Sequence, residues 1–197
     1  MINSVLPGGV KPVVRRTLFS ISERCIMKYS KGDFVVYGTN GICRIDDVET
    51  MTFPMETREH TYYILRPIAS KNNTLFVPDH KEELISKMRY VLKKEEIDEI
   101  LEGAAGSETK WIDDKNQRHS LYKSIIAAGD AQGLLSLIRC IYEKKCTLMQ
   151  AGKKLTSADS GLLESAEKLV KEEFAFALEI PEDSVADYIA SKIGEHI

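Results

Sequence analysis

The hydrophobic period of this chain changes once, and that change restricts the folds open to it. Between residues 29 and 91, apolar and polar side chains alternate over short runs bounded by turn residues, which is typical of half-buried strands. From residue 94 onward, apolar side chains recur at i, i+3 and i+4, which is typical of amphipathic helices. The sequence therefore predicts an α+β protein in which a small β-domain precedes an all-α helical domain.

The first part is predicted to contain five short strands. Turn residues separate them, among them Gly38–Gly41 with its Asn-Gly pair and the polar segment Ser70–Asn73. Short strands in this number indicate a small curled sheet or a barrel. The predicted strands cover residues 34–37, 42–48 with a continuation over 50–53, 60–66, 74–77 and 87–91.

The second part is predicted to be helical over residues 94–101, 114–128, 130–145 and 156–178, with a last helix starting near Pro181. Gly129 is placed to end one helix, and Asp130 and Thr156 are placed to cap the next two. Residues 147–154 are expected to form a loop or a frayed helix end. The apolar stripes are interpreted as core, and they contain Ile97, Ile100, Leu101, Leu121, Tyr122, Ile125, Ile126, Leu134, Leu135, Leu137, Ile138, Ile141, Leu162, Leu163, Ala166, Leu169, Val170, Phe174, Leu178, Val185, Tyr188, Ile189 and Ile193.

Breaker residues and composition divide the chain into segments. The domain boundary is placed at the small, flexible residues Gly103–Ser107. Residues before Met27 show no sustained period, and we hypothesise that Met27 is the true start of the protein. The predicted segments are a flexible N-terminal extension (1–26), a β-domain (27–92), a helix and linker (93–106) and a helical domain (107–197).

The formal net charge of −3 argues against binding nucleic acid through bulk positive charge. Residues 139–154 of the helical part depart from this acidic balance, because their basic residues outnumber their single acid, Glu143. That stretch is either an electrostatic footprint for nucleic acid or a solvated helix end. Its basic residues are Arg139, Lys144, Lys145, Lys153 and Lys154.

Cysteine, histidine and acidic residues give no signal for a metal site, a cofactor or catalysis. Cys25, Cys43, Cys140 and Cys146 form no CxxC pair and do not cluster with histidines, which predicts free thiols. Adjacent acidic pairs such as Glu172–Glu173 are interpreted as solvated surface. Phosphate-binding loops and nucleophile motifs do not occur. We therefore expect a non-catalytic protein without cofactor or metal. Because no apolar run approaches the roughly 20 residues that span a bilayer, we expect it to be soluble, cytoplasmic and free of membrane partners.

The single tryptophan, Trp111, lies among charged and amide residues where the strand-rich part has ended and the helices begin. Two interpretations are open. The ring is either a plug packed between the two domains or an exposed contact residue. An aromatic wedge beside basic side chains suits minor-groove binding, since the cations neutralise phosphates and the ring opposes a base step.

The order of these features resembles the CarD/CdnL family of bacterial transcription regulators, which bind RNA polymerase. A similar β-domain also occurs in transcription-repair coupling helicases. The resemblance runs over nearly the whole chain from Met27. It rests on Lys31–Ile42, Tyr62–Leu65, Leu75–Pro78, Glu95–Ile97, Trp111, Ala128–Asp130, Leu137–Arg139 and Leu155–Ser157, with Leu163, Ala166, Leu169 and Glu173.

This resemblance implies a fold, two partners and a role. The β-domain would be a small Tudor-like five-stranded barrel that docks on the RNA polymerase β subunit by antiparallel strand pairing. Docking is expected through Thr50, Met51, Thr52 and Phe53 and through Leu75 and Phe76, which makes the contact more apolar than in relatives with arginine at edge positions. The helical domain would contact promoter DNA and stabilise the open initiation complex.

On this resemblance, Trp111 matches a tryptophan that wedges into the minor groove at the edge of the transcription bubble, and the exposed-wedge interpretation is preferred. Asp113 and Asp114 follow it, so DNA affinity is expected to be weak without the polymerase. The chain is expected to act as a monomer. The alternative is a protein–protein adaptor in which Trp111 is an interdomain plug without a DNA role. The expected DNA-binding residues are Trp111, Arg118, Arg139, Lys144, Lys145, Lys153 and Lys154.

Overall fold

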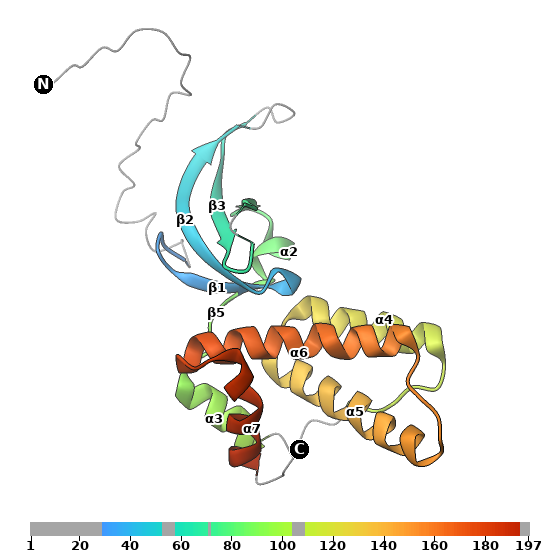
Figure 1. The fold of residues 1–197 in the computed structure, drawn as a ribbon. Helices are drawn as coiled ribbons and strands as arrows, with labels where there is room; N and C mark the ends of the chain where they lie inside the picture. Colours follow the sequence, from blue (N-terminus) through green and yellow to red (C-terminus); the bar gives the residue numbers. More distant parts are fainter. Residues whose placement is uncertain (1–28, 53–57, 71, 104–108, 194–197) are drawn as a thin grey trace, which may run out of the picture.

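A computed structural model describes residues 29–52, 58–70, 72–103 and 109–193. A five-stranded antiparallel sheet comes first, and a bundle of helices follows it (Figure 1). This arrangement confirms the predicted α+β class. The strands are β1 (Phe34–Tyr37), β2 (Ile42–Met51), β3 (His60–Pro67), β4 (Leu75–Pro78) and β5 (Met88–Tyr90).

The sheet has the order β4-β3-β2-β1-β5 and is open. All five predicted strands are present, but the expected closed barrel is wrong, because the sheet does not close on itself. A barrel needs long tilted strands with a matching stagger. Here the terminal strands are short, and helix α2 (Glu82–Ile85) lies between them in the sequence. Leu84 and Ile85 of α2 pack against the β-domain core, so a short helix covers part of it.

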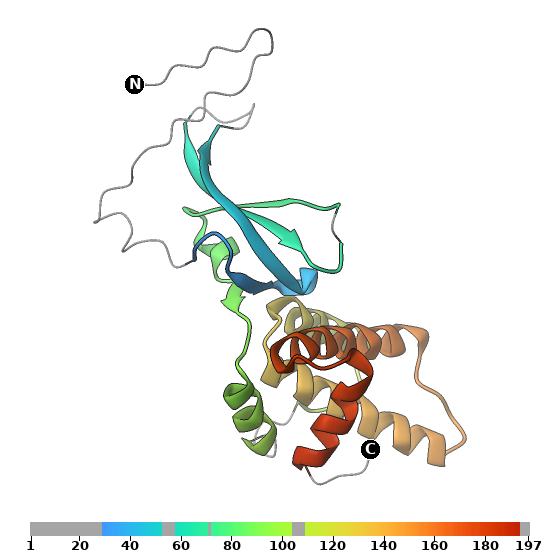
Figure 2. The same cartoon turned by 60° about the vertical axis from the view of Figure 1, so that its left-hand side comes forward.

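The longest pairing in the sheet is the hairpin of β2 and β3, which runs from Cys43↔Pro67 to Met51↔His60 with a bulge between Ile45 and Asp47. Strand β1 pairs with β2 only over Phe34–Val36. The outer part of the hairpin therefore extends past β1 and projects away from the helices (Figure 2). Residues 53–57 lie outside the described residues.

The helical domain is built around its longest helix, α6 (Ser157–Leu178). Helices α3 (Lys94–Gly103) and α7 (Val185–Ile193) lie towards one end of α6, and the 3₁₀ turn η2 (Glu182–Ser184) directly precedes α7. Helices α4 (Lys115–Ala128) and α5 (Ala131–Gln150) pack along the other part of α6 (Figure 1). Among the described residues, no helix has the length and apolar character needed to cross a membrane.

Cap chemistry fixes the helix ends, as predicted. Gly129 ends α4 in the left-handed conformation, with φ of 66°. The side chains of Asp114, Asp130 and Thr156 accept backbone N–H groups at the starts of α4, α5 and α6. One predicted end is wrong, since α5 continues to Gln150 and only the following residues turn. Its basic residues up to Lys145 therefore lie on a regular helix.

Most of the predicted apolar stripe of the helical part is buried in one core. The exceptions are Leu121 and Ile193, which are exposed at 42% and 39%. Ile97 and Leu101 of α3 also belong to this core, so the helical domain gathers apolar residues from before the predicted boundary at Gly103–Ser107. Residues 104–108 themselves lie outside the described residues.

Candidate nucleic-acid and protein interfaces

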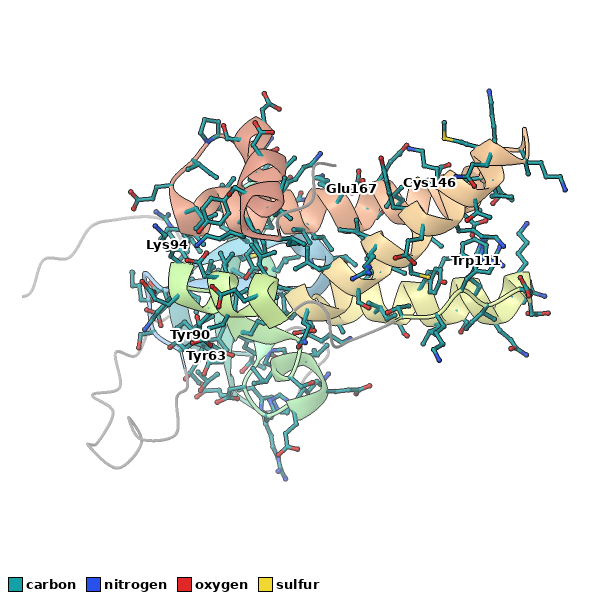
Figure 3. All side chains as sticks on the ribbon, turned by 90° about the horizontal axis from the view of Figure 1, so that it is seen from below. Tyr63, Tyr90, Lys94, Trp111, Cys146 and Glu167 are labelled. Carbon is teal, nitrogen blue, oxygen red and sulfur yellow. The ribbon has the colours of Figure 1, made fainter. Side chains whose placement is uncertain are left out.

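Trp111 lies in the segment before α4, at the opposite end of the helical domain from the labelled Tyr90 of β5 (Figure 3). Its ring is half-buried and packs against the helical core, edge-on to Tyr122 with ring centroids 6.4 Å apart. Two cations lie over the ring. The guanidinium of Arg118 is 4.3 Å from its centroid, and Lys144 Nζ is 5.2 Å from it. The described contacts of Trp111 thus come from the helical domain.

The predicted role of Arg118 as a DNA contact needs correction, because its guanidinium is already occupied. Arg118 donates from Nε and Nη2 to the two carboxylate oxygens of Asp159, at 2.9 and 3.1 Å, and from Nη1 to the carbonyls of Ile112 and Asp113. Its side chain is only 6% exposed and that of Asp159 only 2%. The buried pair therefore supports the Trp111 ring from inside the domain, where phosphates do not reach.

Asp159 is held by the start of α6 as well as by Arg118. Thr156 Oγ1 donates to its carboxylate at 2.6 Å, and His119 Nε2 lies 3.3 Å from it. Burial by itself raises the pKa of this carboxyl, but the hydrogen bonds from Arg118 and Thr156 outweigh burial and leave the pKa of Asp159 below its usual value. The carboxylate therefore stays charged, and it ties the segment that carries Trp111 to the N-terminus of α6.

A pocket of about 300 Å³ opens beside Trp111. One face of α5 forms its floor, and the segment before α4 forms the facing wall. Ser136 connects the two, since its hydroxyl accepts from the backbone N–H of Thr109 at 2.8 Å and donates to the hydroxyl of Thr109 at 2.9 Å. The lining residues are Thr109, Lys110, Trp111, Ser136, Arg139, Cys140, Glu143, Lys144 and Thr147.

The other predicted DNA-binding residues lie on or after α5. Arg139 and Lys144 line the pocket, and Arg139 also pairs with Glu143, 2.9 Å away. Lys145 lies over the ring of Tyr142, 5.4 Å from its centroid, and Lys153 and Lys154 are exposed beyond the end of the helix. The structure brings Arg139 and Lys144 together with Trp111 in one pocket and leaves Lys153 and Lys154 outside its lining.

The predicted polymerase-binding residues that the structure describes lie at two edges of the sheet. Thr50 and Met51 end β2 and Thr52 follows it; here the described partner of β2 on one side is β3, and β1 does not reach. Leu75 and Phe76 belong to β4, the terminal strand of the sheet, and Phe76 is 43% exposed. Phe53 lies outside the described residues. Among the described residues, no further strand pairs with β4 or with the outer part of β2 on the side away from β3, which is the arrangement that strand addition requires.

Sequence reasoning missed an ion pair between the two domains. Arg89 of β5 donates from Nη2 to Glu173 Oε2 of α6 and to the carbonyl of Gly129, both at 2.6 Å. The backbone N–H of Leu92 also donates to Glu173, at 3.2 Å. Glu173 is only 3% exposed, so the interpretation of Glu172–Glu173 as solvated surface is wrong. We call Arg89, Gly129 and Glu173 the interdomain clamp.

Glu172 makes a second contact between the domains. Its Oε1 accepts from the backbone N–H of Ile42 in β2, at 3.2 Å. Gly41 makes this approach possible, because a Cβ built there lies 2.7 Å from the Glu172 carboxylate. Burial raises the pKa of Glu172 above its usual value. Nearby, the exposed rings of Phe34 and Phe176 meet across the same junction, with centroids 5.0 Å apart.

One signal in the sequence could have identified this junction. Glu172 and Glu173 lie on α6 next to the apolar stripe positions 169, 170 and 174, which a solvated pair does not require.

Cys43 and Cys140 are buried and Cys146 is exposed, all as free thiols. Among the described residues, no group of three or more histidine, cysteine, aspartate or glutamate side chains could hold a metal ion.

Comparison with known proteins identifies the β-domain. Residues 29–89 match the family model of the CarD-like/TRCF RID domain, where RID denotes an RNA polymerase-interacting domain, a non-catalytic interaction module. No curated protein sequence matches the chain. The match covers strands β1 to β4 and ends within β5, before helix α3 begins at Lys94. The resemblance to the CarD family is thereby confirmed for this part of the chain, and residues 29–89 are consistent with a CarD-like family.

Proposed function

We propose that this chain is a non-catalytic transcription regulator that docks on the β subunit of RNA polymerase and contacts promoter DNA through the region of Trp111. The observation that carries the proposal is the match of residues 29–89 to an RNA polymerase-interacting domain. The helical domain, fixed to that domain, supplies the second contact.

Docking uses two edges of the sheet, the outer part of β2 and the terminal strand β4. An extended segment of the polymerase pairs with the outer part of β2 or with β4 through main-chain hydrogen bonds. Met51, Leu75 and Phe76 lie on these edges, and Phe76 has an exposed ring. Apolar side chains at an edge favour a partner strand with apolar residues of its own, which makes the contact less dependent on salt than one based on arginine.

The DNA contact is weak by itself and gains strength from docking. Lys144, Lys145, Lys153 and Lys154 attract phosphates near Trp111, while Glu143, Asp113 and Asp114 oppose them. Binding to the polymerase raises the local concentration of the helical domain at the promoter, so a weak contact becomes effective. If this region binds melted DNA better than closed DNA, it shifts the equilibrium towards the open complex.

The interdomain clamp supports this division of labour. Arg89 and Glu173, together with Glu172 and Ile42, connect the docking domain directly to α6. A fixed relation between the domains means that docking also sets where Trp111 points. If the helical domain were freely jointed to the β-domain, docking would not orient Trp111, because the helical domain could take many orientations relative to the DNA.

One substitution at each of the two expected contacts tests the proposal, and the first is at the polymerase contact. Phe76→Asp, on the edge strand β4, should weaken co-purification with RNA polymerase, whereas Arg44→Ala, exposed on β2, should leave it intact. Failure of the wild-type chain to bind polymerase contradicts the proposal.

Trp111→Ala should shorten the lifetime of the open complex about five-fold or more while polymerase binding persists, because stacking of one base on an aromatic ring is worth about 1–3 kcal/mol. Leu121→Ala, exposed on the neighbouring helix α4, is the matched control. If Trp111→Ala lowers stability but leaves the open-complex lifetime unchanged, the DNA role fails and a protein–protein adaptor function replaces it.

A further inference from the structure

One face of the sheet is covered by the helical domain only in part. Val36 of β1 and Ile42 of β2 are buried on this face, and Glu172 of α6 accepts from the backbone N–H of Ile42. Figure 1 shows β1 and the start of β2 lying over α6. The next pair on the same two strands is Phe34 and Arg44, whose side chains share this face and are exposed. The covered part of the face therefore borders an open part.

The open part continues in both directions from this pair. Arg44 lies directly opposite Arg66 of β3, and Phe34 packs against Phe176 of α6 with ring centroids 5.0 Å apart. All four side chains are exposed. They form a continuous row that begins on the helical domain and crosses three strands of the sheet. We call Phe176, Phe34, Arg44 and Arg66 the junction row; its first half is aromatic and its second half cationic.

Asp46 holds the two guanidinium groups of the junction row side by side. Its Oδ1 accepts from Arg44 Nε at 2.9 Å, and its Oδ2 accepts from Arg66 Nε at 2.6 Å. The hydrogen bond from Arg44 is the main reason why the pKa of Asp46 lies below its usual value, so the carboxylate stays charged. Two cations against one anion leave one positive charge. Within the described residues, no group accepts from the Nη nitrogens of Arg66.

Stability of the fold does not account for the junction row. Exposed ion pairs contribute little to the free energy of unfolding, because water solvates both partners well in the unfolded chain. The exposed rings of Phe34 and Phe176 leave apolar surface in water, and Ile68, on the same face of β3 as Arg66, is also exposed. Exposed apolar surface that is rimmed by charged groups is typical of protein interaction sites.

Charge and spacing define the partner. A carboxylate fits Arg66, because a guanidinium group can donate to both carboxylate oxygens at once. An apolar side chain fits the two rings. Neighbouring strands lie about 4.8 Å apart, so Phe34 on β1 and Arg66 on β3 are about 10 Å apart across the sheet. An extended protein segment covers this distance with about three residues.

Nucleic acid fits the junction row less well than a protein segment does. A nucleic-acid strand presents a continuous series of phosphates, which requires several cations along its path. The row has one net positive charge, and Glu172 precedes Phe176 by one helical turn on the same face of α6. This carboxylate repels a series of phosphates, whereas a single carboxylate can reach Arg66 without approaching it.

We propose that the junction row binds an acidic segment of another protein, in which an aspartate or glutamate pairs with Arg66 and Arg44 and an apolar side chain packs on Phe34 and Phe176. This surface is a face of the sheet and differs from the two strand edges of the polymerase contact, so the inference goes beyond the proposed function. Because the row contains residues of both domains, its partner recognises the arrangement that the interdomain clamp maintains.

A selection from a library of random peptides tests the chemistry of this partner. The full-length wild-type chain is the bait, and the double variant Arg44→Ala/Arg66→Ala removes peptides that bind elsewhere. Enriched peptides should contain an aspartate or glutamate and a large apolar residue about three positions apart. Lack of enrichment, or a consensus without an acidic residue, overturns the proposal.

Fluorescence anisotropy of the labelled consensus peptide then measures the role of each half of the row. Arg66→Ala should weaken binding about ten-fold, because it removes charge-assisted hydrogen bonds, and Phe176→Ser should weaken it several-fold. Arg58→Ala, an exposed arginine just before β3 and outside the row, is the matched control and should leave binding unchanged. Equal effects of Arg66→Ala and Arg58→Ala contradict the assignment.

Charge reversal and a nucleic-acid probe complete the test. Arg66→Glu should abolish binding of the consensus peptide and bind a peptide in which lysine replaces the acidic residue; absence of this recovery overturns the proposed pairing. A single-stranded oligothymidylate is titrated in parallel. If it binds more tightly than the peptide and loses this affinity in Arg66→Ala, nucleic acid replaces protein as the partner. Because Arg44→Ala is expected to keep polymerase co-purification, failure here leaves the proposed function untouched.

Discussion

Helix α6 carries a buried carboxylate near each end, and each carboxylate holds an arginine from another element. Near its N-terminus Asp159 binds Arg118 of α4, and near its C-terminus Glu173 binds Arg89 of β5. The two carboxylates are 14 positions apart, which is about 21 Å along the helix axis at about 1.5 Å per residue. One pair lies within the helical domain, and the other joins the two domains.

The pairs differ in burial and in what surrounds them. Arg118 is almost fully buried and its remaining donor reaches backbone carbonyls, whereas the Arg89 side chain is 27% exposed. The first pair therefore behaves as part of a core, where removal of one partner leaves an uncompensated charge. The second lies at a junction that water reaches. The same chemistry therefore supports the Trp111 ring in one place and joins the β-domain to the helical domain in the other.

The largest expected effect comes from breaking the pair within the domain. Asp159→Ala leaves Arg118 buried without its carboxylate and should lower the free energy of unfolding by about 3–5 kcal/mol. Urea unfolding followed by Trp111 fluorescence measures this loss. Glu164→Ala, exposed on the same helix, should stay within about 0.5 kcal/mol of wild type. A loss below about 1 kcal/mol for Asp159→Ala contradicts the core role of the pair.

A combined variant sharpens this result. Arg118→Met together with Asp159→Leu replaces the ion pair by apolar side chains and should recover most of the lost stability. It also removes the guanidinium that lies over Trp111, so the Trp111 emission should still differ from wild type. Equal emission in the two proteins means that Arg118 does not orient the ring.

Breaking the interdomain clamp should have a smaller effect with a different character. Arg89→Ala leaves Glu173 with the N–H of Leu92 as its described donor and should cost about 2–3 kcal/mol. Hydrogen exchange should show the β-domain strands opening before the helical core, whereas in wild type the two are coupled. Arg66→Ala, an exposed residue of the same sheet, is the control. Unchanged exchange in Arg89→Ala shows that the clamp does not couple the domains.

The smallest effect concerns Glu172, which borders the clamp and responds to pH in the opposite sense from Asp159. Because burial raises the pKa of Glu172, the folded protein binds the proton more tightly, and this group reduces stability as pH rises from its unfolded to its folded pKa. The lowered pKa of Asp159 instead contributes stability that is lost as pH falls through the folded value.

Glu172→Gln keeps an oxygen that accepts from Ile42 and removes the charge. It should raise stability by less than about 1 kcal/mol at neutral pH, and the difference from wild type should vanish as pH falls to the usual range of glutamate. Thermal unfolding across roughly pH 4 to 8 measures this difference, with Glu164→Gln as control. A difference that grows towards acid has the wrong sign and contradicts the raised pKa.

The sequence by itself determined the order of elements and most of their ends. Alternation of period two specified the five strands, and side-chain caps such as Asp130 and Thr156 specified where helices begin. These signals act over a few residues, so they can be read along the chain. The family resemblance was also readable, because it rests on short local motifs, and the family model matches those of residues 29–89.

Tertiary structure alone decided how the parts of the candidate site relate. Arg118 and Asp159 are 41 positions apart, and Arg89 and Glu173 are 84 apart. Composition shows such residues only as members of a charged surface, which is why Arg118 was expected on DNA and Glu173 in solvent. Whether a charge is buried, and whether a sheet closes, depends on the partner that folding brings to it, and local pattern contains no information about that partner.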